Sequence, residues 1–345
     1  MKSTVNRRKF LGAASALAGA AILPKSSVFG MPSIIDNFGN SGSKIKGVQI
    51  GVITYSFREM PDQSAEATLD YIRKSGITAI ELMGGPAEDF AGAPKNTFDA
   101  SGIYPLYRKR QAGEDLTAAE KKKLEDFQAA RKAHAEELSQ WRLKAPMQKF
   151  EEFRKMYNKA GIKIYAFKPS AFGKENSDAE IEYGMKAAKL LGASHVTLEH
   201  PSDDAHTLRL GKIGEKVGMK IGYHGHEQQT PTFWDTAIQQ SPANGMNLDF
   251  GHFVAAGNAN PVEFVQAKHE HIFSMHVKDR KTRAHGGANL PWGEGDTPIP
   301  AVLKLMQKNK YKFPATVELE YKIPEGSNSV EEVKKCLEFC KRALG

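Results

Sequence analysis

Five acidic or imidazole side chains follow one another along the second half of the chain, each at or near the end of a short apolar run. They are Glu199, His224, Asp249, His276 and Glu318. A buried carboxylate or imidazole is costly unless it is paired or bound to a metal, so five such residues are hard to explain as ordinary core. Carboxylates mixed with imidazoles suit a divalent cofactor, with Mn²⁺ favoured and Zn²⁺, Mg²⁺, Fe²⁺ or Co²⁺ as alternatives. Because no cysteine stands among them, a structural zinc site is not expected.

Further polar side chains stand close to these five, on the same strand face or in the turn that follows. They are His226, Glu227, His252, Lys278 and Glu320. A lone histidine on a strand is more often a structural residue than a ligand, and charged residues in helical patterns are usually solvated. We therefore interpret the remaining polar candidates as structural or surface groups. These are His195, His269, Asp203, Asp204 and Lys121–Lys123.

The elements that must position these residues alternate between strands and helices. Strands are predicted at 49–57, 78–83, 163–168, 195–199, 220–224, 246–250, 272–277 and 315–320, and helices at 64–75, 178–191, 208–217 and 330–344. This alternation requires a parallel sheet with right-handed crossovers, and eight units indicate closure into a barrel. No glycine-rich phosphate turn follows the first strand, which argues against an open doubly wound sheet. We therefore predict an α/β fold, a (β/α)₈ TIM barrel, whose strand ends gather the candidates in one pocket.

Residues 84–161 interrupt this rhythm between the second and third predicted strands. We expect a loop over Gly84–Tyr104 and a capping box at Thr117–Glu120 that opens a long charged helix to about Leu143. Residues 147–160 then read as the ordinary barrel helix. The barrel thus carries a long helical insertion after strand two, at about 84–147, which serves as a lid, an oligomer contact or a solvated helix without a chemical role.

The N-terminus has the pattern of an export signal. Arg7 and Arg8 precede an apolar stretch that is too short to span a bilayer as a mature helix. The arginine pair indicates the Tat route and a periplasmic location. We expect a signal peptide at 1–30, a linker at 31–46 and the barrel at 47–345, with no stable membrane span in the mature form.

Charge and cysteine content exclude two further classes of protein. The formal net charge is +8, but residues 1–30 contribute five positive charges and no negative one, which leaves +3 for the rest. That is too mild to indicate a nucleic-acid partner. The two cysteines, Cys336 and Cys340, lie four residues apart on a predicted helix, so we expect free thiols and no disulfide scaffold.

Three segments resemble the sugar phosphate isomerase/epimerase superfamily, the xylose isomerase-like TIM barrels of AP endonuclease family 2. They are Leu248–His252, Met275–Asp279 and Thr316–Glu320, and the resemblance extends from about residue 47 to the C-terminus. In that family a divalent metal is typically held by Glu, Asp, His and Glu. Asp249, His276 and Glu318 match the last three ligands. At the first position this chain departs, because strand five offers His224 and the nearby carboxylate is Glu199 on strand four.

The resemblance implies deprotonation next to a carbonyl, with the metal stabilising an enediolate. Glu318, Glu199 or His226 would move the proton, and Lys278 or His252 would stabilise the developing negative charge. We therefore expect a divalent-metal-dependent isomerase or epimerase that acts on a keto-sugar or polyol.

Three other functions are weighed against this one. A hydratase or lyase acting on a 3-keto-glycoside-derived sugar would use the same enolisation. An AP endonuclease-like nuclease would need a three-metal cluster and a strongly basic DNA face. A non-catalytic sugar-binding protein would not need convergent metal ligands. We expect a small-molecule sugar as partner and no nucleic acid, and leave a homo-oligomer open.

Overall fold

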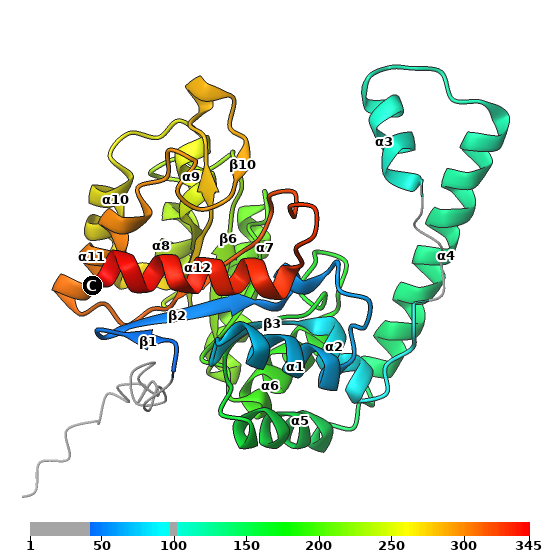
Figure 1. The fold of residues 1–345 in the computed structure, drawn as a ribbon. Coiled ribbons are helices and arrows are strands. Elements are labelled where there is room, and N and C mark those ends of the chain that lie inside the picture. Colours follow the sequence, from blue (N-terminus) through cyan, green and yellow to red (C-terminus); the bar gives the residue numbers. More distant parts are fainter. Residues whose placement is uncertain (1–41, 97–101) are drawn as a thin grey trace, which may run out of the picture. The chain divides into compact units, whose positions relative to one another are not determined.

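The computed structural model describes residues 42–96 and 102–345, in which eight parallel strands close into a barrel (Figure 1). The barrel strands are β2 (Val48–Ile53), β3 (Ala79–Met83), β4 (Lys163–Lys168), β5 (His195–Glu199), β6 (Lys220–His224), β7 (Asn244–Asp249), β8 (Ile272–Val277) and β11 (Ala315–Val317). Each strand pairs with the next, and the pairings of β11 with β2 and of β2 with β3 close the ring. The short strand β1 (Lys44–Ile45) adds to β2 in antiparallel orientation.

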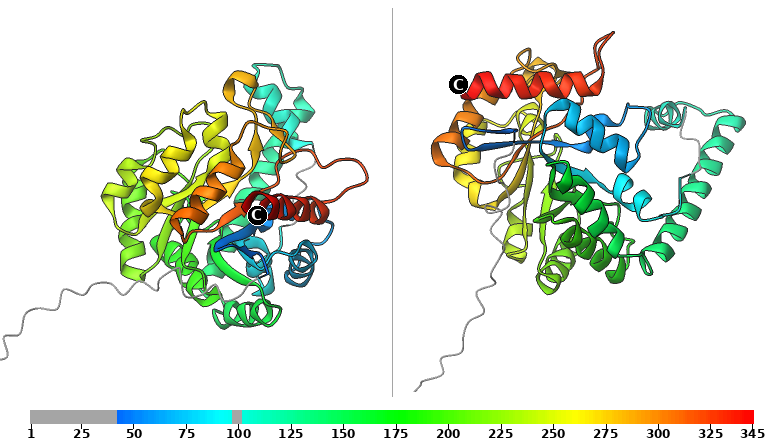
Figure 2. Two further views of the ribbon diagram at one scale, coloured as in Figure 1. Left: turned by 60° about the vertical axis from the view of Figure 1, so that its left-hand side comes forward. Right: turned by 60° about the horizontal axis from the view of Figure 1, so that its bottom comes forward.

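Helices connect the strands and cover the outside of the barrel (Figure 2). The main connecting helices are α1 (Ala65–Ser75), α5 (Gln148–Lys159), α6 (Asp178–Leu191), α7 (Asp204–Val217), α8 (Asp235–Gln240), α10 (Pro261–Lys268), α11 (Ile299–Asn309) and α12 (Ser329–Leu344). Their ends follow local chemistry: Ser177 and Glu180 form a capping box at the start of α6, and Gly192 ends it in the left-handed conformation. The predicted TIM barrel is confirmed.

The described residues between β3 and β4, 84–96 and 102–162, form four helices: α2 (Gly84–Phe90), α3 (Ile103–Gln111), α4 (Ala118–Arg142) and α5. The capping box at Thr117 and Glu120 is confirmed, with both reciprocal hydrogen bonds present. The predicted loop over 84–104 is wrong, because α2 occupies its first part and α3 begins at Ile103. Neither helix has a strong periodic signal: α2 opens with two glycines and a proline, and α3 buries only Ile103 and Leu106.

The end of α4 is joined to α2 by a buried ion pair and to the segment after β4 by a hydrogen bond. Arg142 Nε lies 3.0 Å from Glu88 Oε1, and its guanidinium also donates to Ser170 Oγ at 2.8 Å. Tyr183 donates to the same Glu88 carboxylate. Nearer its start, α4 packs on α3 through a small separate apolar cluster. The buried members of that cluster are Ile103, Leu106 and Leu124.

The barrel interior is closed by polar pairs and close backbone approaches. Tyr165 reaches across to Thr316 Oγ1 at 2.7 Å, over Gly51, where a Cβ would lie 2.6 Å from the Tyr165 oxygen. His195 Nε2 lies 2.9 Å from Ser274 Oγ, and burial lowers the pKa of His195 to about 4. His195 is thus a buried, hydrogen-bonded residue of the barrel interior, which agrees with its prediction as a structural residue.

Three strands end earlier than predicted. The first strand ends at Ile53 and continues as the 3₁₀ turn η1 (Thr54–Phe57). β7 ends at Asp249, which caps the short helix α9 (Phe250–Ala255) by accepting a hydrogen bond from the His252 amide. β11 ends at Val317, so Glu318 and Glu320 lie just past the strand and not within it.

Both cysteines lie on α12 and are free, as predicted, and the structure shows that both are buried. Within residues 42–96 and 102–345, no helix combines the length and the apolar character needed to cross a membrane. The expected signal peptide at 1–30 and most of the linker lie outside the described residues.

Candidate metal centre at the barrel mouth

Four of the predicted residues meet at the carboxyl ends of neighbouring strands. His224 ends β6, Asp249 ends β7, His276 lies near the end of β8, and Glu318 follows β11. Strand register places Asp249 opposite His276. One donor atom from each of the four lies within 4.8 Å of all the others, and all four side chains are buried. We call these four residues the inner cluster.

The distances within the inner cluster show how its charges are arranged. His276 Nδ1 lies 2.9 Å from Glu318 Oε2 and 3.8 Å from Asp249 Oδ2, while His224 Nε2 lies 3.9 Å from the same aspartate oxygen. The ammonium of Lys278 lies 2.9 Å from Asp249 and 2.7 Å from Glu318. The Lys278 ammonium therefore links the two carboxylates of the inner cluster.

Burial and charge move the pKa values of the inner cluster in opposite directions. Burial, helped by the positive charge of Lys168, holds the pKa of His224 well below its usual range, so its imidazole is neutral. Burial also acts against protonated His276, but the carboxylates of Glu81 and Glu318 outweigh it and raise the pKa of His276 to about 10. For Lys278, three neighbouring carboxylates outweigh burial and raise the pKa.

Glu81 on β3 is a member of this site that the sequence reasoning missed. Its side chain is fully buried, and its Oε2 lies 2.7 Å from His276 Nε2. It also accepts hydrogen bonds from Thr197 at 2.6 Å and from Asn247 at 3.0 Å. Burial alone would raise the pKa of Glu81, but His276 and the other partners lower it to about 2. The signal that could have identified Glu81 is that it is the single carboxylate in the otherwise apolar run 79–83.

The inner cluster fits a divalent metal ion. The buried nitrogen Nδ1 of His224 has no hydrogen-bond partner, whereas Asp249 Oδ2 has an ion-pair partner in Lys278 Nζ at 2.9 Å. Buried nitrogen and oxygen atoms without a hydrogen-bond partner are rare in folded proteins unless a bound ligand contacts them. Because Glu81 occupies Nε2 of His276, Nδ1 is the nitrogen that faces the cluster. Two imidazoles and two carboxylates form a common donor set for divalent transition metals.

Glu199 and His226 lie toward solvent from the inner cluster. The Glu199 side chain is 53% exposed and pairs with Lys168 Nζ at 2.8 Å, and its Oε2 lies 3.6 Å from His226 Nδ1. The structure therefore brings Glu199 together with Lys168, a residue the sequence reasoning did not select, and not with the four residues of the inner cluster. Burial lowers the pKa of Lys168, but Glu199 and Glu81 outweigh it and raise the pKa.

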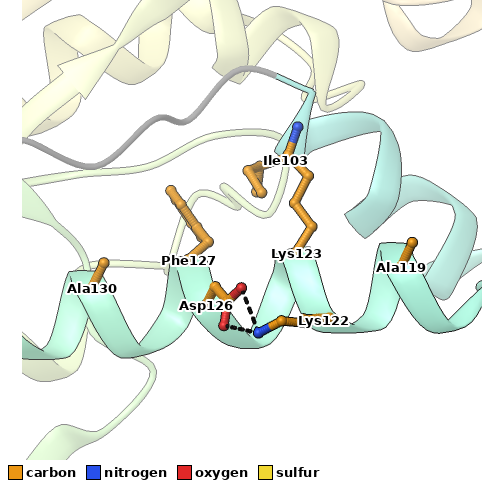
Figure 3. Close-up of a pocket in the computed structure, with 7 residues that line it drawn as sticks. All are labelled: Ile103, Ala119, Lys122, Lys123, Asp126, Phe127 and Ala130. Atoms are coloured by element: carbon orange, nitrogen blue, oxygen red, sulfur yellow. Dashed lines mark hydrogen bonds and ion pairs between the residues drawn. The ribbon is translucent and has the colours of Figure 1, made fainter.

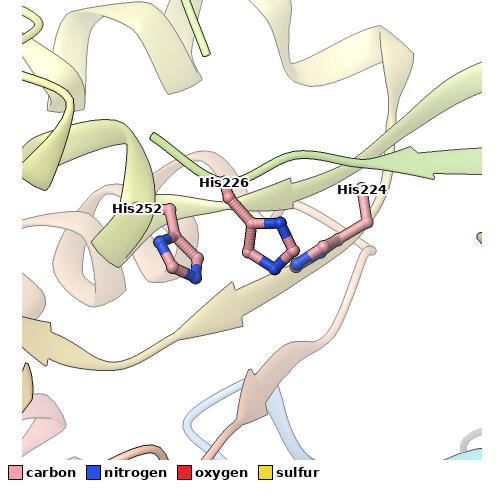
Figure 4. A group of neighbouring side chains, drawn as sticks. All are labelled: His224, His226 and His252. Atoms are coloured by element: carbon pink, nitrogen blue, oxygen red, sulfur yellow. The ribbon is translucent and has the colours of Figure 1, made fainter. Parts of the chain in front are cut away.

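His252 connects the site to a second set of charges. Its Nε2 lies 3.3 Å from Glu320 Oε2, which also lies 2.6 Å from Lys278 Nζ. Its Nδ1 lies 3.3 Å from Glu227 Oε1, and Arg280 contacts both that carboxylate and Nδ1. The rings of His224, His226 and His252 lie in a row in Figure 4, and neighbouring rings are nearly perpendicular, with interplanar angles of 83° and 88°.

Gly251 explains how the turn after β7 fits against β8. A Cβ at this position would lie 2.7 Å from the carbonyl oxygen of Lys278, closer than real Cβ contacts come. The glycine of the segment Leu248–His252 therefore lets α9 approach Lys278 and places His252 beside it.

A different concave surface lies on α3 and α4, away from these residues. It is a groove of about 500 Å³ (Figure 3). The residues that line it are Ile103, Ala119, Lys122, Lys123, Asp126, Phe127 and Ala130. It contains no predicted site residue, and Lys122 pairs with Asp126 there at 3.0 Å.

Comparisons with known proteins agree with this architecture. Residues 116–343 match the family profile described as xylose isomerase-like TIM barrel. No curated protein sequence matches significantly.

Three solved structures illustrate the similarity. A sugar phosphate isomerase/epimerase from Parabacteroides distasonis is 18% identical, with 85% of this chain and 93% of that chain covered and a TM-score of 0.52. The probable 3-DHS dehydratase AsbF from Bacillus anthracis is 15% identical, with 84% and 97% covered and a TM-score of 0.55. The IOLI protein with a bound zinc atom is 16% identical, with 86% and 97% covered and a TM-score of 0.52. At these identities the likeness shows the fold.

Proposed function

Because the chain belongs to the xylose isomerase-like TIM barrel family, we propose that it is a divalent-metal-dependent isomerase or epimerase acting on a keto-sugar or polyol. The observation that carries the proposal is the inner cluster, in which two buried carboxylates and two buried imidazoles meet at the barrel mouth and His224 Nδ1 has no hydrogen-bond partner. A binding protein without chemistry has no need to bury such a set. The sugar phosphate isomerase/epimerase among the structural neighbours supports the same substrate class.

His224, Asp249, His276 and Glu318 would hold the ion. When bound, a divalent ion supplies Lewis acidity toward a carbonyl and a neighbouring hydroxyl. We favour Mn²⁺, with Zn²⁺ as the main alternative because two imidazoles contribute and because a zinc atom is bound in one structural neighbour. The protein's part is to fix the ligands, and Glu81 does so for His276 by accepting a hydrogen bond from its Nε2.

The residues around the cluster supply proton transfer. Glu199 presents an accessible carboxylate beside Lys168 and is the group we assign to remove a proton next to the carbonyl, with His226 at 3.6 Å to pass it on. The ammonium of Lys278 is placed to stabilise negative charge on a substrate oxygen, because its neighbours keep it protonated. Glu320 connects His252 to Lys278, because its Oε2 lies 3.3 Å from His252 Nε2 and 2.6 Å from Lys278 Nζ.

A hydratase or lyase acting on a 3-keto-glycoside-derived sugar is the second candidate. The arrangement that favours it is the chain His252–Glu320–Lys278, which gives a second proton donor for loss or addition of water after the first deprotonation. A probable dehydratase with the same fold supports this alternative. The nuclease is disfavoured by the mild charge of +3 outside residues 1–30.

The test is proton exchange with solvent. Protein of known metal content is incubated in D₂O with keto-sugars and 3-keto-glycosides, and deuterium next to the carbonyl is followed by NMR. We expect exchange in at least one compound, with epimerised product for an epimerase and an unsaturated product for a lyase. Asp249→Ala and Glu318→Ala should lose both metal and exchange while keeping the fold, whereas Glu263→Ala, an exposed carboxylate on α10, should change neither. Absence of exchange from every compound with metal-loaded protein would refute the proposal.

We also propose that the chain is exported through its arginine pair and that residues 84–147 are an insertion, since α2, α3 and α4 add no strand. Fusing residues 1–30 to a reporter tests export. Arg7→Lys together with Arg8→Lys should keep the reporter in the cytoplasm.

A further inference from the structure

Lys168 stands at the barrel mouth on the side opposite Lys278. It is the last residue of β4, so it lies at the same end of the barrel as the inner cluster. Around the ring of eight strands, β4 is four strands away from β8 in either direction. Because Lys278 directly follows β8, the two lysines stand on opposite walls of the mouth.

The ammonium of Lys168 is within reach of the interior of the mouth. Its side chain is 17% exposed. Its charge interacts with those of Glu81 and Glu318, and after burial it is the largest cause that keeps the His224 imidazole neutral. A sugar with its carbonyl at the inner cluster can therefore reach Lys168 with its distal hydroxyls.

This ammonium has hydrogen-bonding capacity to spare. An ammonium carries three N–H donors. Within residues 42–96 and 102–345, Lys168 donates to a single acceptor, Glu199 Oε1 at 2.8 Å, whereas Lys278 lies within 2.9 Å of three carboxylates. A mostly buried cation with unused donors gains from contact with a ligand oxygen.

Contacts on both sides fix the segment that carries Lys168. Pro169 restricts Lys168 to an extended backbone, and a Cβ on Gly84 would lie 2.8 Å from Pro169 Cα, so the start of α2 packs directly on this turn. The guanidinium of Arg142, 3% exposed at the end of α4, donates to the Ser170 carbonyl at 3.2 Å and to the Ser170 hydroxyl at 2.8 Å. α2 and α4 therefore hold the wall of the mouth on which Lys168 stands.

We propose that Lys168 is a further substrate-contacting residue, whose ammonium donates to a sugar hydroxyl remote from the reacting carbon, and that Arg142 is a positioning residue for it. This inference rests on the proposed function, because it takes a polyhydroxy compound as the ligand. A hydroxyl both donates and accepts, and Lys168 and Glu199 offer one group of each kind side by side. The site then selects sugars with a free hydroxyl at that position, and the helices between β3 and β4 contribute to this selection through Arg142.

Competitive acetylation tests the contact without requiring turnover. Full-length protein of known metal content is labelled with a trace of isotopic acetic anhydride, with and without each keto-sugar and 3-keto-glycoside of the exchange experiment. The label on every lysine is measured by mass spectrometry. We expect at least one compound to reduce labelling of Lys168 in proportion to its occupancy. Lys220 is the internal control, since it begins β6 at the opposite end of the barrel and its labelling should not change.

Calorimetric binding of the protecting compound to variants makes the assignment specific. Lys168→Met removes the donor and leaves Glu199 to water, because this carboxylate is 53% exposed, so the fold should be kept. Affinity should fall about 10–100-fold, as for loss of a hydrogen bond from a charged donor, and Lys168→Arg should recover part of it. Lys155→Met, at an exposed lysine of α5, should bind like the wild-type chain.

Arg142→Lys tests the positioning role. It keeps a positive charge beside Glu88, but a single ammonium nitrogen cannot span Glu88 and both oxygens of Ser170. Sugar should protect Lys168 less well in this variant while far-UV circular dichroism stays unchanged, and Ser170→Ala replaces it if it fails to fold. Unchanged protection in both variants would overturn the role of Arg142.

The outcomes separate this inference from the proposed reaction. Protection of Lys168 without deuterium exchange would keep the contact and reject the isomerase. Deuterium exchange of a compound that leaves the labelling of Lys168 unchanged would overturn the contact alone. Unchanged labelling with every compound, or wild-type affinity in Lys168→Met, would likewise overturn it.

Discussion

Replacing Glu81 by glutamine tests whether this buried carboxylate fixes His276 for metal binding. The two oxygens of Glu81 accept from His276 at 2.7 Å, from Thr197 at 2.6 Å, and from Asn247 at 3.0 and 3.1 Å. An amide has one oxygen and one NH₂ group. Whichever way it turns, its NH₂ faces the Asn247 donor, and the partner of His276 is no longer charged.

The expected effect on metal affinity is large and that on folding is moderate. Loss of a charged partner behind a histidine ligand weakens metal binding about 10–100-fold, which corresponds to about 1.4–2.7 kcal/mol. The free energy of unfolding should fall by about 1–3 kcal/mol for the unsatisfied Asn247 donor. Glu81→Ala leaves three hydrogen-bond donors without an acceptor. It should lower the free energy of unfolding by several kcal/mol, enough to prevent stable folding.

The assay is competition between the protein and a chelator for Zn²⁺, with thermal unfolding measured on the same samples. Thr197→Val is the matched control, because it removes a different hydrogen bond to Glu81 and leaves the contact with His276. We expect the control to bind Zn²⁺ within about threefold of the wild-type chain, since the ligand's own partner is intact. Wild-type Zn²⁺ affinity in Glu81→Gln would refute the idea that Glu81 orients His276.

Further predictions concern packing and charge. Lys278→Met leaves Asp249 and Glu318 without their buried cation, so metal-free protein should lose about 3–5 kcal/mol in chemical unfolding, and added Zn²⁺ should restore more stability than it adds to the wild-type chain. Gly251→Ala should cost about 1–3 kcal/mol in the same measurement, because its Cβ meets the Lys278 backbone; an unchanged midpoint would contradict that contact. Lys109 and the capping box lower the pKa of Glu120 from 4.5 to about 2, so the stabilisation is complete above about pH 4.5 and is lost toward pH 2. The protection factors of the α3 amides against hydrogen exchange should fall over that window, and Glu120→Gln should abolish this pH dependence.

The barrel could be predicted because its signals are local. Runs of β-branched residues bounded by glycine identify strands, and a serine or threonine followed three residues later by glutamate identifies helix starts. α2 and α3 were missed because they have little apolar periodicity, and their helical form depends on contacts with the rest of the chain, such as the ion pair between Glu88 and Arg142. The short β11 was overextended because Glu318 and Glu320 continue its alternating pattern beyond Val317.

Site residues could be predicted only where a polar side chain stands at the end of an apolar strand. Asp249 and His276 stand out there, and the structure places them with His224 and Glu318. Whether Glu199 would point inward depends on the side-chain partner it finds, and Lys168 comes from a neighbouring strand that the sequence does not align with it. The role of Glu81 could not be predicted for the same reason, because its hydrogen-bond partners come from three other strands of the barrel.

The two thiols of α12 bear on when this chain folds relative to its transport. Burial raises the pKa of Cys336 far above its usual range and that of Cys340 to about 12, so neither is a reactive thiolate in the folded protein. A chain that crossed a membrane unfolded would offer both sulfurs to disulfide-forming machinery on the oxidising side. A chain that folds first carries them shielded within its core, so the proposed export of the folded protein leaves its redox state unchanged.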